Sequence, residues 1–179
     1  MAKSTRQKAK LLYLAQMFLG ETDEDHGMTI GQIIEYLIRQ GISSERKSLY
    51  QDFEELRAFG LDVVSQKTGR QTLYYVGSRQ FELAELKLLV DAVQSSKFMT
   101  AKKTEILIRK LERLTSRFQA VQLERQVYGQ KLKNENETIY YGVDTIHAAI
   151  QKNVKIRFRY FQWTVKRKRS SAITELFIR

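Results

Sequence analysis

The stretch that decides the fold runs from residue 42 to residue 64 and reads ISSERKSLYQDFEELRAFGLDVV. Three of its apolar residues, Leu49, Phe53 and Leu56, recur at helical spacing and predict the buried face of one helix. Glycine favours the left-handed conformation that ends helices, so we expect this helix to end at Gly60. The stretch therefore predicts an amphipathic helix that gives way to a strand-like pattern.

A second helix is expected just upstream. Thr29 and Gln32 stand three residues apart, which is a capping-box pattern. The apolar residues behind this cap keep helical spacing: Ile30, Ile33, Ile34, Leu37 and Ile38. Gly41 is expected to end this helix, and Ser43 or Ser44 to cap the next one. Two helices joined by so short a turn predict a helix-turn-helix arrangement.

The chain then shows strand-like patterning. Residues 62–66 and 71–76 are rich in β-formers, and Gly69 lies in the turn between them. A hairpin that directly follows the second helix of a helix-turn-helix is called a wing. Residues 1–80 therefore predict a winged helix-turn-helix domain.

The other elements follow from the same patterns. Helices are expected over residues 5–19, 82–96, 101–118 and 143–152, and a half-buried strand over residues 154–161. Ser4 is expected to cap the first helix and Gly20 to end it. Residues 119–138 are interpreted as a linker, and residues 164–179 show no clear continuation.

The predicted fold class is α+β, mostly helical. Residues 1–80 form the winged helix-turn-helix, and residues 81–120 form a helical dimerisation and linker region. Residues 139–179 form an incomplete C-terminal β-domain.

Composition excludes several chemistries. The chain has no cysteine, so disulfides, thiolate nucleophiles and cysteine-ligated zinc are excluded. Apolar runs are too short to cross a bilayer, and no signal-peptide pattern is present, so we expect a cytoplasmic protein with no membrane partner. No phosphate-binding glycine loop, nucleophile elbow or HExxH motif occurs, so neither an enzyme nor a cofactor is expected. His26 beside Asp23, Glu24 and Asp25 could bind a metal, but an acidic surface loop is the preferred interpretation.

The net charge of +11 suits an anionic partner, nucleic acid above all. Its distribution complicates that interpretation. Residues 140–179 carry nine basic and two acidic side chains, whereas residues 1–80 carry eleven and ten. The basic run at residues 166–169 is interpreted as a solvated tail rather than a phosphate-binding segment. Net charge alone therefore does not support DNA binding by residues 1–80, and the hypothesis depends on the arrangement of side chains along the predicted helix and hairpin.

That local pattern is a face of hydrogen-bond donors. Opposite its apolar side, the predicted recognition helix carries side chains able to read base edges or bind phosphates. Arg46, Lys47 and Gln51 are expected to be solvent-exposed, and Lys67 and Arg70 to lie at the hairpin tip. The predicted DNA-binding residues are Ser44, Arg46, Lys47, Ser48, Tyr50, Gln51, Lys67 and Arg70.

The sequence resembles a known group of regulators. The stretch at residues 42–64 is similar to the winged helix of DeoR-like and WYL-domain transcriptional regulators, whose recognition helices share the pattern T-[IVL]-x-x-D-[IL]-x-x-L. The corresponding residues here are Ser48, Leu49, Asp52, Phe53 and Leu56. RQFELAELKLLVDAVQSSKF and YYGVDTIHAAIQKNVKIRFRYFQW resemble the region after the wing and the start of a WYL domain.

The resemblance implies a transcriptional regulator that binds double-stranded DNA as a homodimer and responds to an effector of unknown identity. The sensing domain of that family is an SH3-like (Sm-like) β-barrel that needs more residues than follow here. Its Trp-Tyr-Leu tripeptide is absent, and Thr164 follows Trp163. We expect a domain truncated after its first helix and strand.

The middle helices are the expected dimer interface. The helix over residues 82–96 is apolar over more of its circumference than one core-facing stripe needs, as Leu86, Leu88 and Leu89 illustrate. One competing function is a winged-helix protein-interaction module that pairs with a full-length relative without binding DNA. RNA binding led by the basic C-terminal segment is a further alternative, although no RNP-like aromatic pattern supports it.

Overall fold

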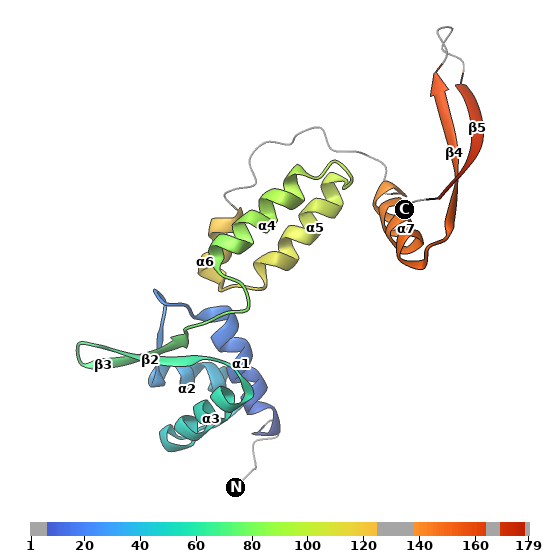
Figure 1. Cartoon of the computed structure of the whole chain (residues 1–179). Helices are drawn as coiled ribbons and strands as arrows, with labels where there is room; N and C mark the ends of the chain where they lie inside the picture. Colours follow the sequence, from blue (N-terminus) through green and yellow to red (C-terminus); the bar gives the residue numbers. More distant parts are fainter. Residues whose placement is uncertain (1–6, 125–137, 164–168, 178–179) are drawn as a thin grey trace. The chain divides into compact units, whose positions relative to one another are not determined.

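The computed structural model describes residues 7–124, 138–163 and 169–177 (Figure 1). The fold is α+β, as predicted, and mostly helical, with seven α-helices and short antiparallel strands in these ranges. None of the described helices combines the length and apolar character needed to span a bilayer. The chain forms two compact units: Met1–Ser95 with Thr104–Gly129, and Ser96–Lys103 with Gln130–Arg179.

Three helices and a three-stranded sheet make up the first part of the first unit. They are α1 (Lys10–Glu21), α2 (Ile30–Arg39), α3 (Arg46–Phe59), β1 (Met28–Thr29), β2 (Val63–Thr68) and β3 (Gln71–Val76). Strand β3 lies between β1 and β2, antiparallel to both. Apolar side chains of these elements meet in a buried N-terminal core: Leu14, Met17, Phe18, Ile33, Leu37, Ile42, Leu49, Phe53, Leu56, Val63, Tyr74 and Val76.

Helix α1 differs from its predicted bounds of residues 5–19. A 3-10 turn over Gln7–Ala9 precedes it, and the helix continues to Glu21, so Gly20 lies inside it. The predicted cap, Ser4, lies outside the described residues. The predicted stop at Gly20 is wrong because an internal glycine costs a helix only about 1 kcal/mol.

Thr22 shows what ends α1 instead. Its hydroxyl donates to the Phe18 carbonyl at 2.7 Å and accepts from the Val76 amide of β3 at 3.2 Å. The helix end is therefore tied to a strand 54 residues further along the chain.

The capping box of α2 is confirmed. The backbone N–H of Gln32 donates to the Thr29 hydroxyl at 3.3 Å, and the backbone N–H of Thr29 donates to the side-chain oxygen Oε1 of Gln32 at 2.8 Å. Helix α2 stops at Arg39, followed by Gly41 with φ +76°. That conformation is one that side-chain-bearing residues rarely adopt, so the predicted glycine stop is also confirmed.

Helix α3 begins later than expected. Its first residue is Arg46, and the N-cap residue is Glu45, which makes no side-chain capping bond. The prediction of Ser43 or Ser44 as the cap is wrong, because the chain stays extended through Glu45 (φ −94°, ψ 151°). Gly60 ends the helix with φ +105°, as predicted.

Strands β2 and β3 form the predicted hairpin. They pair from Val63 opposite Val76 to Thr68 opposite Gln71. The turn between them has two residues, and Gly69 has φ +62°, as tight hairpin turns of this kind require.

The next helices correct the predicted middle region. Helix α4 (Leu83–Ser95) agrees with the predicted 82–96. The single helix predicted over residues 101–118 is wrong, because α5 (Ala101–Glu112) and α6 (Arg117–Glu124) are separate. The predicted linker is thus partly helical, and residues 125–137 lie outside the described ranges. Four buried residues join α4, α5 and α6 in a three-helix cluster: Leu86, Val90, Ile108 and Leu123.

The second unit contains α7 (Thr138–Lys152), β4 (Lys155–Trp163) and β5 (Arg169–Phe177). Helix α7 is longer than the predicted 143–152. Strand β5 pairs with β4 along its full length, so the expectation of no regular structure after β4 is wrong. A two-stranded sheet buries little of its own surface, and Phe158, predicted on the buried face, is 40% exposed.

Candidate nucleic-acid interface

The inner face of α3 is fixed in the N-terminal core. Leu49, Phe53 and Leu56 are buried, as predicted. The Phe53 ring packs edge-on against Phe18 with centroids 5.4 Å apart, and it lies 5.1 Å from the ring of Tyr74 on β3. Helix α3 therefore has one orientation relative to α1 and the sheet.

A buried lysine adds a polar anchor on the same side. Lys10, only 6% exposed, forms an ion pair with Asp52 and donates to the Ser48 hydroxyl at 2.7 Å. These contacts join the first turn of α1 to the first half of α3. Ser48 is one of the predicted DNA-binding residues, whereas Lys10 carries no sequence signal for its role in this anchor.

The outer face of α3 carries the predicted donors. Arg46, Lys47 and Gln51 are exposed, as the helical spacing predicts. Ser44 differs, because its hydroxyl is buried and has no hydrogen-bond partner among the described residues. Ser48 is exposed like these three residues, although its hydroxyl accepts from Lys10, whereas the Ser44 hydroxyl is not accessible to a partner.

Tyr50 lies at the centre of this face. Its hydroxyl accepts a hydrogen bond from Arg46 Nε at 2.8 Å and contacts the hydroxyl of Tyr74. The bond from Arg46 lowers the pKa of Tyr50, while burial raises the pKa of Tyr74. Tyr74 did not stand out in the sequence, because its partner lies 24 residues away.

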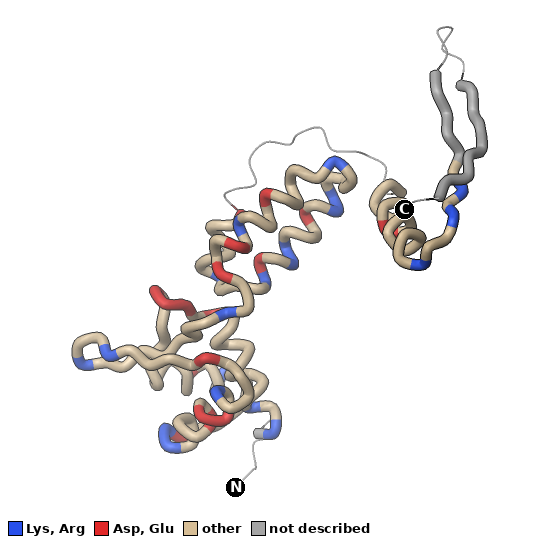
Figure 2. Tube along the Cα trace, viewed as in Figure 1, with Lys and Arg blue, Asp and Glu red and all other residues tan. Residues whose placement is uncertain are grey.

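Lys67 and Arg70 are exposed at the end of the β2–β3 hairpin. Figure 2 shows basic positions at this turn and at the start of α3, both toward the left of the view. These two groups of positive charge belong to elements that share one core through Phe53 and Tyr74.

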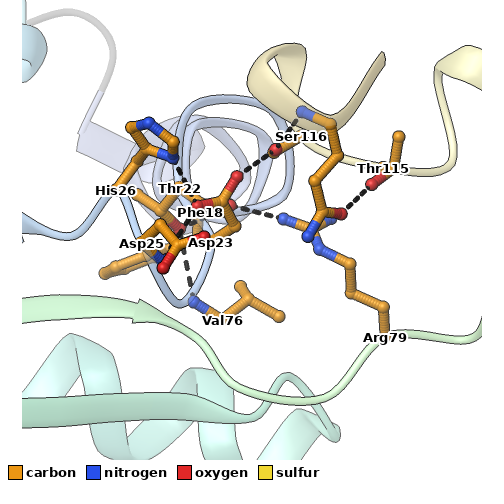
Figure 3. Close-up of polar contacts among 10 residues, drawn as sticks. Phe18, Thr22, Asp23, Asp25, His26, Val76, Arg79, Thr115 and Ser116 are labelled. Carbon is orange, nitrogen blue, oxygen red and sulfur yellow. Dashed lines mark hydrogen bonds and ion pairs between the residues drawn. The ribbon is translucent and has the colours of Figure 1, made fainter. Parts of the chain in front are cut away.

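A second polar cluster, here called the junction, lies where α1, the segment after β3 and α6 meet (Figure 3). The Ser116 hydroxyl caps α6 by accepting from the Gln119 amide at 3.1 Å, and it donates to Asp23. Arg79 donates to the carbonyls of Leu19 and Thr22 at 2.8 and 2.6 Å.

Asp23 is the centre of the junction and is 3% exposed. It also accepts from His26 Nδ1 at 2.7 Å, and the His26 ring stacks on Phe118 with centroids 3.7 Å apart. Burial by itself would raise the pKa of Asp23, but the hydrogen bonds from Ser116 and His26 outweigh it and lower the pKa. The preferred interpretation of an exposed acidic loop is therefore wrong at Asp23.

A cavity of about 500 Å³ opens beside the junction. Two ion pairs line it, Glu21 with Arg117 at 2.7 Å and Glu35 with Arg39 at 3.5 Å. No group of three or more histidine or acidic side chains suited to a metal occurs in the described parts of the chain. The donor-rich face of α3 therefore stands as the candidate site.

Neither the models of known protein families nor the curated proteins give a match to this chain. The resemblance to WYL-domain and DeoR-like regulators thus depends on the sequence motifs alone and stays a prediction.

Proposed function

We propose that this protein is a sequence-specific DNA-binding transcriptional regulator whose N-terminal region is a winged helix-turn-helix. One observation carries the proposal. Helix α3 is fixed by its inner face in the N-terminal core and presents Arg46, Lys47 and Gln51 at its N-terminal half. That is the end a recognition helix inserts into the major groove.

The β2–β3 hairpin acts as the wing. Arg70 in its turn and Lys67 near the end of β2 are both exposed. Such cations neutralise phosphates without reading sequence, so they add affinity and salt dependence. In this arrangement α3 contacts the base edges and the β2–β3 hairpin contacts the phosphates.

Dimerisation through α4 completes the function. Regulators of this kind gain specificity by pairing two half-sites, which requires a symmetric interface. On α4, Leu88 is 71% exposed and its neighbour Leu89 is 37% exposed. We assign a second copy of the chain to this surface. Leu86, also expected there, is fully buried in the three-helix cluster and cannot serve.

We assign a sensory role to the C-terminal unit. A helix followed by two antiparallel strands, α7 and β4–β5, agrees with the start of an SH3-like (Sm-like) β-domain of the WYL type.

The proposal is tested by selecting bound sequences from random duplex DNA with the purified full chain. We expect a discrete palindromic motif. The K67A/R70A double variant should weaken binding to all sequences alike and reduce the salt slope by up to about two. K102A/K110A removes the same charge from exposed positions on α5 and should leave the slope unchanged. Failure to enrich any motif would refute sequence-specific binding.

A competing function has its own support. Phe59 at the end of α3 is 86% exposed, and Leu12 on α1 is 72% exposed. Large apolar side chains at the surface suit a protein partner, such as a full-length relative. In that case no DNA motif is selected, and Phe59→Ala abolishes pairing with the relative.

A further inference from the structure

Arg46 is held in place by its own helix. Its Nε donates to the Tyr50 hydroxyl at 2.8 Å, and its guanidinium carbon lies 5.8 Å from the centre of the Tyr50 ring. The two residues are four apart, so they share one side of α3. A long side chain that usually samples many rotamers is therefore restrained before any ligand is present.

Tyr50 is in turn held from the sheet. The ring of Phe53 meets the ring of Tyr50 edge-on at 6.5 Å and lies 5.1 Å from the ring of Tyr74, a residue only 7% exposed whose hydroxyl lies beside that of Tyr50. A continuous chain of contacts thus leads from buried β3 to the exposed guanidinium.

The electrostatics of the helix end do not favour an arginine at this position. Arg46 is the first residue of the helix, where the macrodipole disfavours a positive charge. Binding a ligand does account for it, because Nε is engaged by Tyr50 while the two terminal nitrogens form no hydrogen bond or ion pair with the described residues. Those nitrogens form a fork that matches two acceptors side by side.

Guanine presents such a pair of acceptors, O6 and N7, in the major groove. We infer that Arg46 reads one guanine in each half-site and that Tyr50 and Tyr74 are positioning residues for it. The inference depends on the proposed DNA-binding function and adds to it the base that is read.

The test compares the wild-type chain with R46K, Y50F and Y74F on the selected DNA. Fluorescence anisotropy gives the affinity for the motif and for a duplex in which 7-deazaguanine, lacking N7, replaces the guanine. The wild type should lose about tenfold in affinity on this replacement, the scale of one bidentate contact. Y50F should lose most of this discrimination and Y74F part of it, with unchanged melting temperature for Y50F.

Two controls isolate the positioning role. R46K keeps the charge and should keep the salt slope while losing the guanine preference. Y75F removes a hydroxyl from the adjacent residue of β3, which points to the opposite face of the strand, and should bind as wild type does.

The outcomes separate the two proposals. If a motif is selected but Arg46 is not needed to recognise any guanine in it, the inference is overturned and the proposed function stays intact. Wild-type discrimination in Y50F likewise overturns the positioning role. The absence of any selected motif overturns both proposals.

Discussion

The N-terminal core and the three-helix cluster differ in how completely they bury their apolar side chains. The N-terminal core joins twelve buried residues from three helices and a sheet, and α3 covers it with a polar outer face. The three-helix cluster has only four buried residues, and α4 leaves Leu88 exposed. Buried apolar area is the main source of stability, so the first region is the firmer scaffold and the second has apolar surface left for a partner.

The largest expected effect is in the N-terminal core. Phe53→Ala should lower the free energy of unfolding by about 3–5 kcal/mol, because a ring packed against Phe18 and Tyr74 is lost. Urea unfolding followed by circular dichroism measures it. Phe59→Ala, an exposed phenylalanine of the same helix, is the matched control and should change stability by no more than about 0.5 kcal/mol. Equal effects of the two substitutions would contradict the assigned core.

A smaller effect is expected in the three-helix cluster. Leu86→Ala should cost about 2–3 kcal/mol, at the low end for a buried leucine, because so small a cluster can close part of the cavity. Leu88→Ala, two residues further on α4, serves as the control and should be nearly neutral in the monomer. If Leu86→Ala destabilises the chain as much as Phe53→Ala does, the N-terminal core is not the firmer of the two regions.

The junction links these two regions and should contribute less than either. Ser116→Ala removes the cap of α6 and the hydrogen bond to Asp23, with an expected cost of about 1–2 kcal/mol. Thermal unfolding should also show a broader transition, because the two regions lose part of their coupling. Ser95→Ala, an exposed serine at the end of α4, provides the control.

Acid should weaken the junction in a defined direction. The pKa of Asp23 in the fold lies below its ordinary value of 3.8. Its contribution to stability is therefore complete above about pH 3.8 and is lost as the pH falls through the lower folded value. Asp23→Asn should lose less stability than wild type between pH 4 and pH 2, measured by urea unfolding. Parallel pH profiles would contradict this role of Asp23.

The smallest effect on stability, and the sharpest test of the comparison, concerns the exposed surface of α4. Leu88→Glu should change monomer stability by no more than about 0.5 kcal/mol, yet shift the sedimentation coefficient from dimer toward monomer at micromolar concentration. Lys87→Glu, next to it, is the control for added negative charge. A wild-type chain that sediments as a strict monomer would refute the assigned interface.

Several local features could be predicted from sequence because short-range rules control them. The capping box of Thr29 and Gln32, the glycine stops at Gly41 and Gly60, and the hairpin turn at Gly69 all appear in the structure. The spacing of neighbouring residues on a helix likewise separates the buried from the exposed face of α3. These features depend on residues only a few positions apart.

Other features escaped prediction because their causes lie far along the chain. The break between α5 and α6 accompanies a bond between Ser116 and Asp23, 93 residues apart. The buried Lys10 pairs with Asp52, 42 residues further along the chain. The residue pattern of a single segment does not predict contacts with residues so far along the chain.

The sequence by itself determined the amphipathic helices, the hairpin and the donor-rich face of α3, since backbone preference and hydrophobic period are local properties. Tertiary structure alone decided where α1 ends, that Asp23 is buried, and that Lys10 pairs with Asp52. Those outcomes depend on packing and on satisfying buried polar groups, and both require the folded chain to bring distant residues into contact.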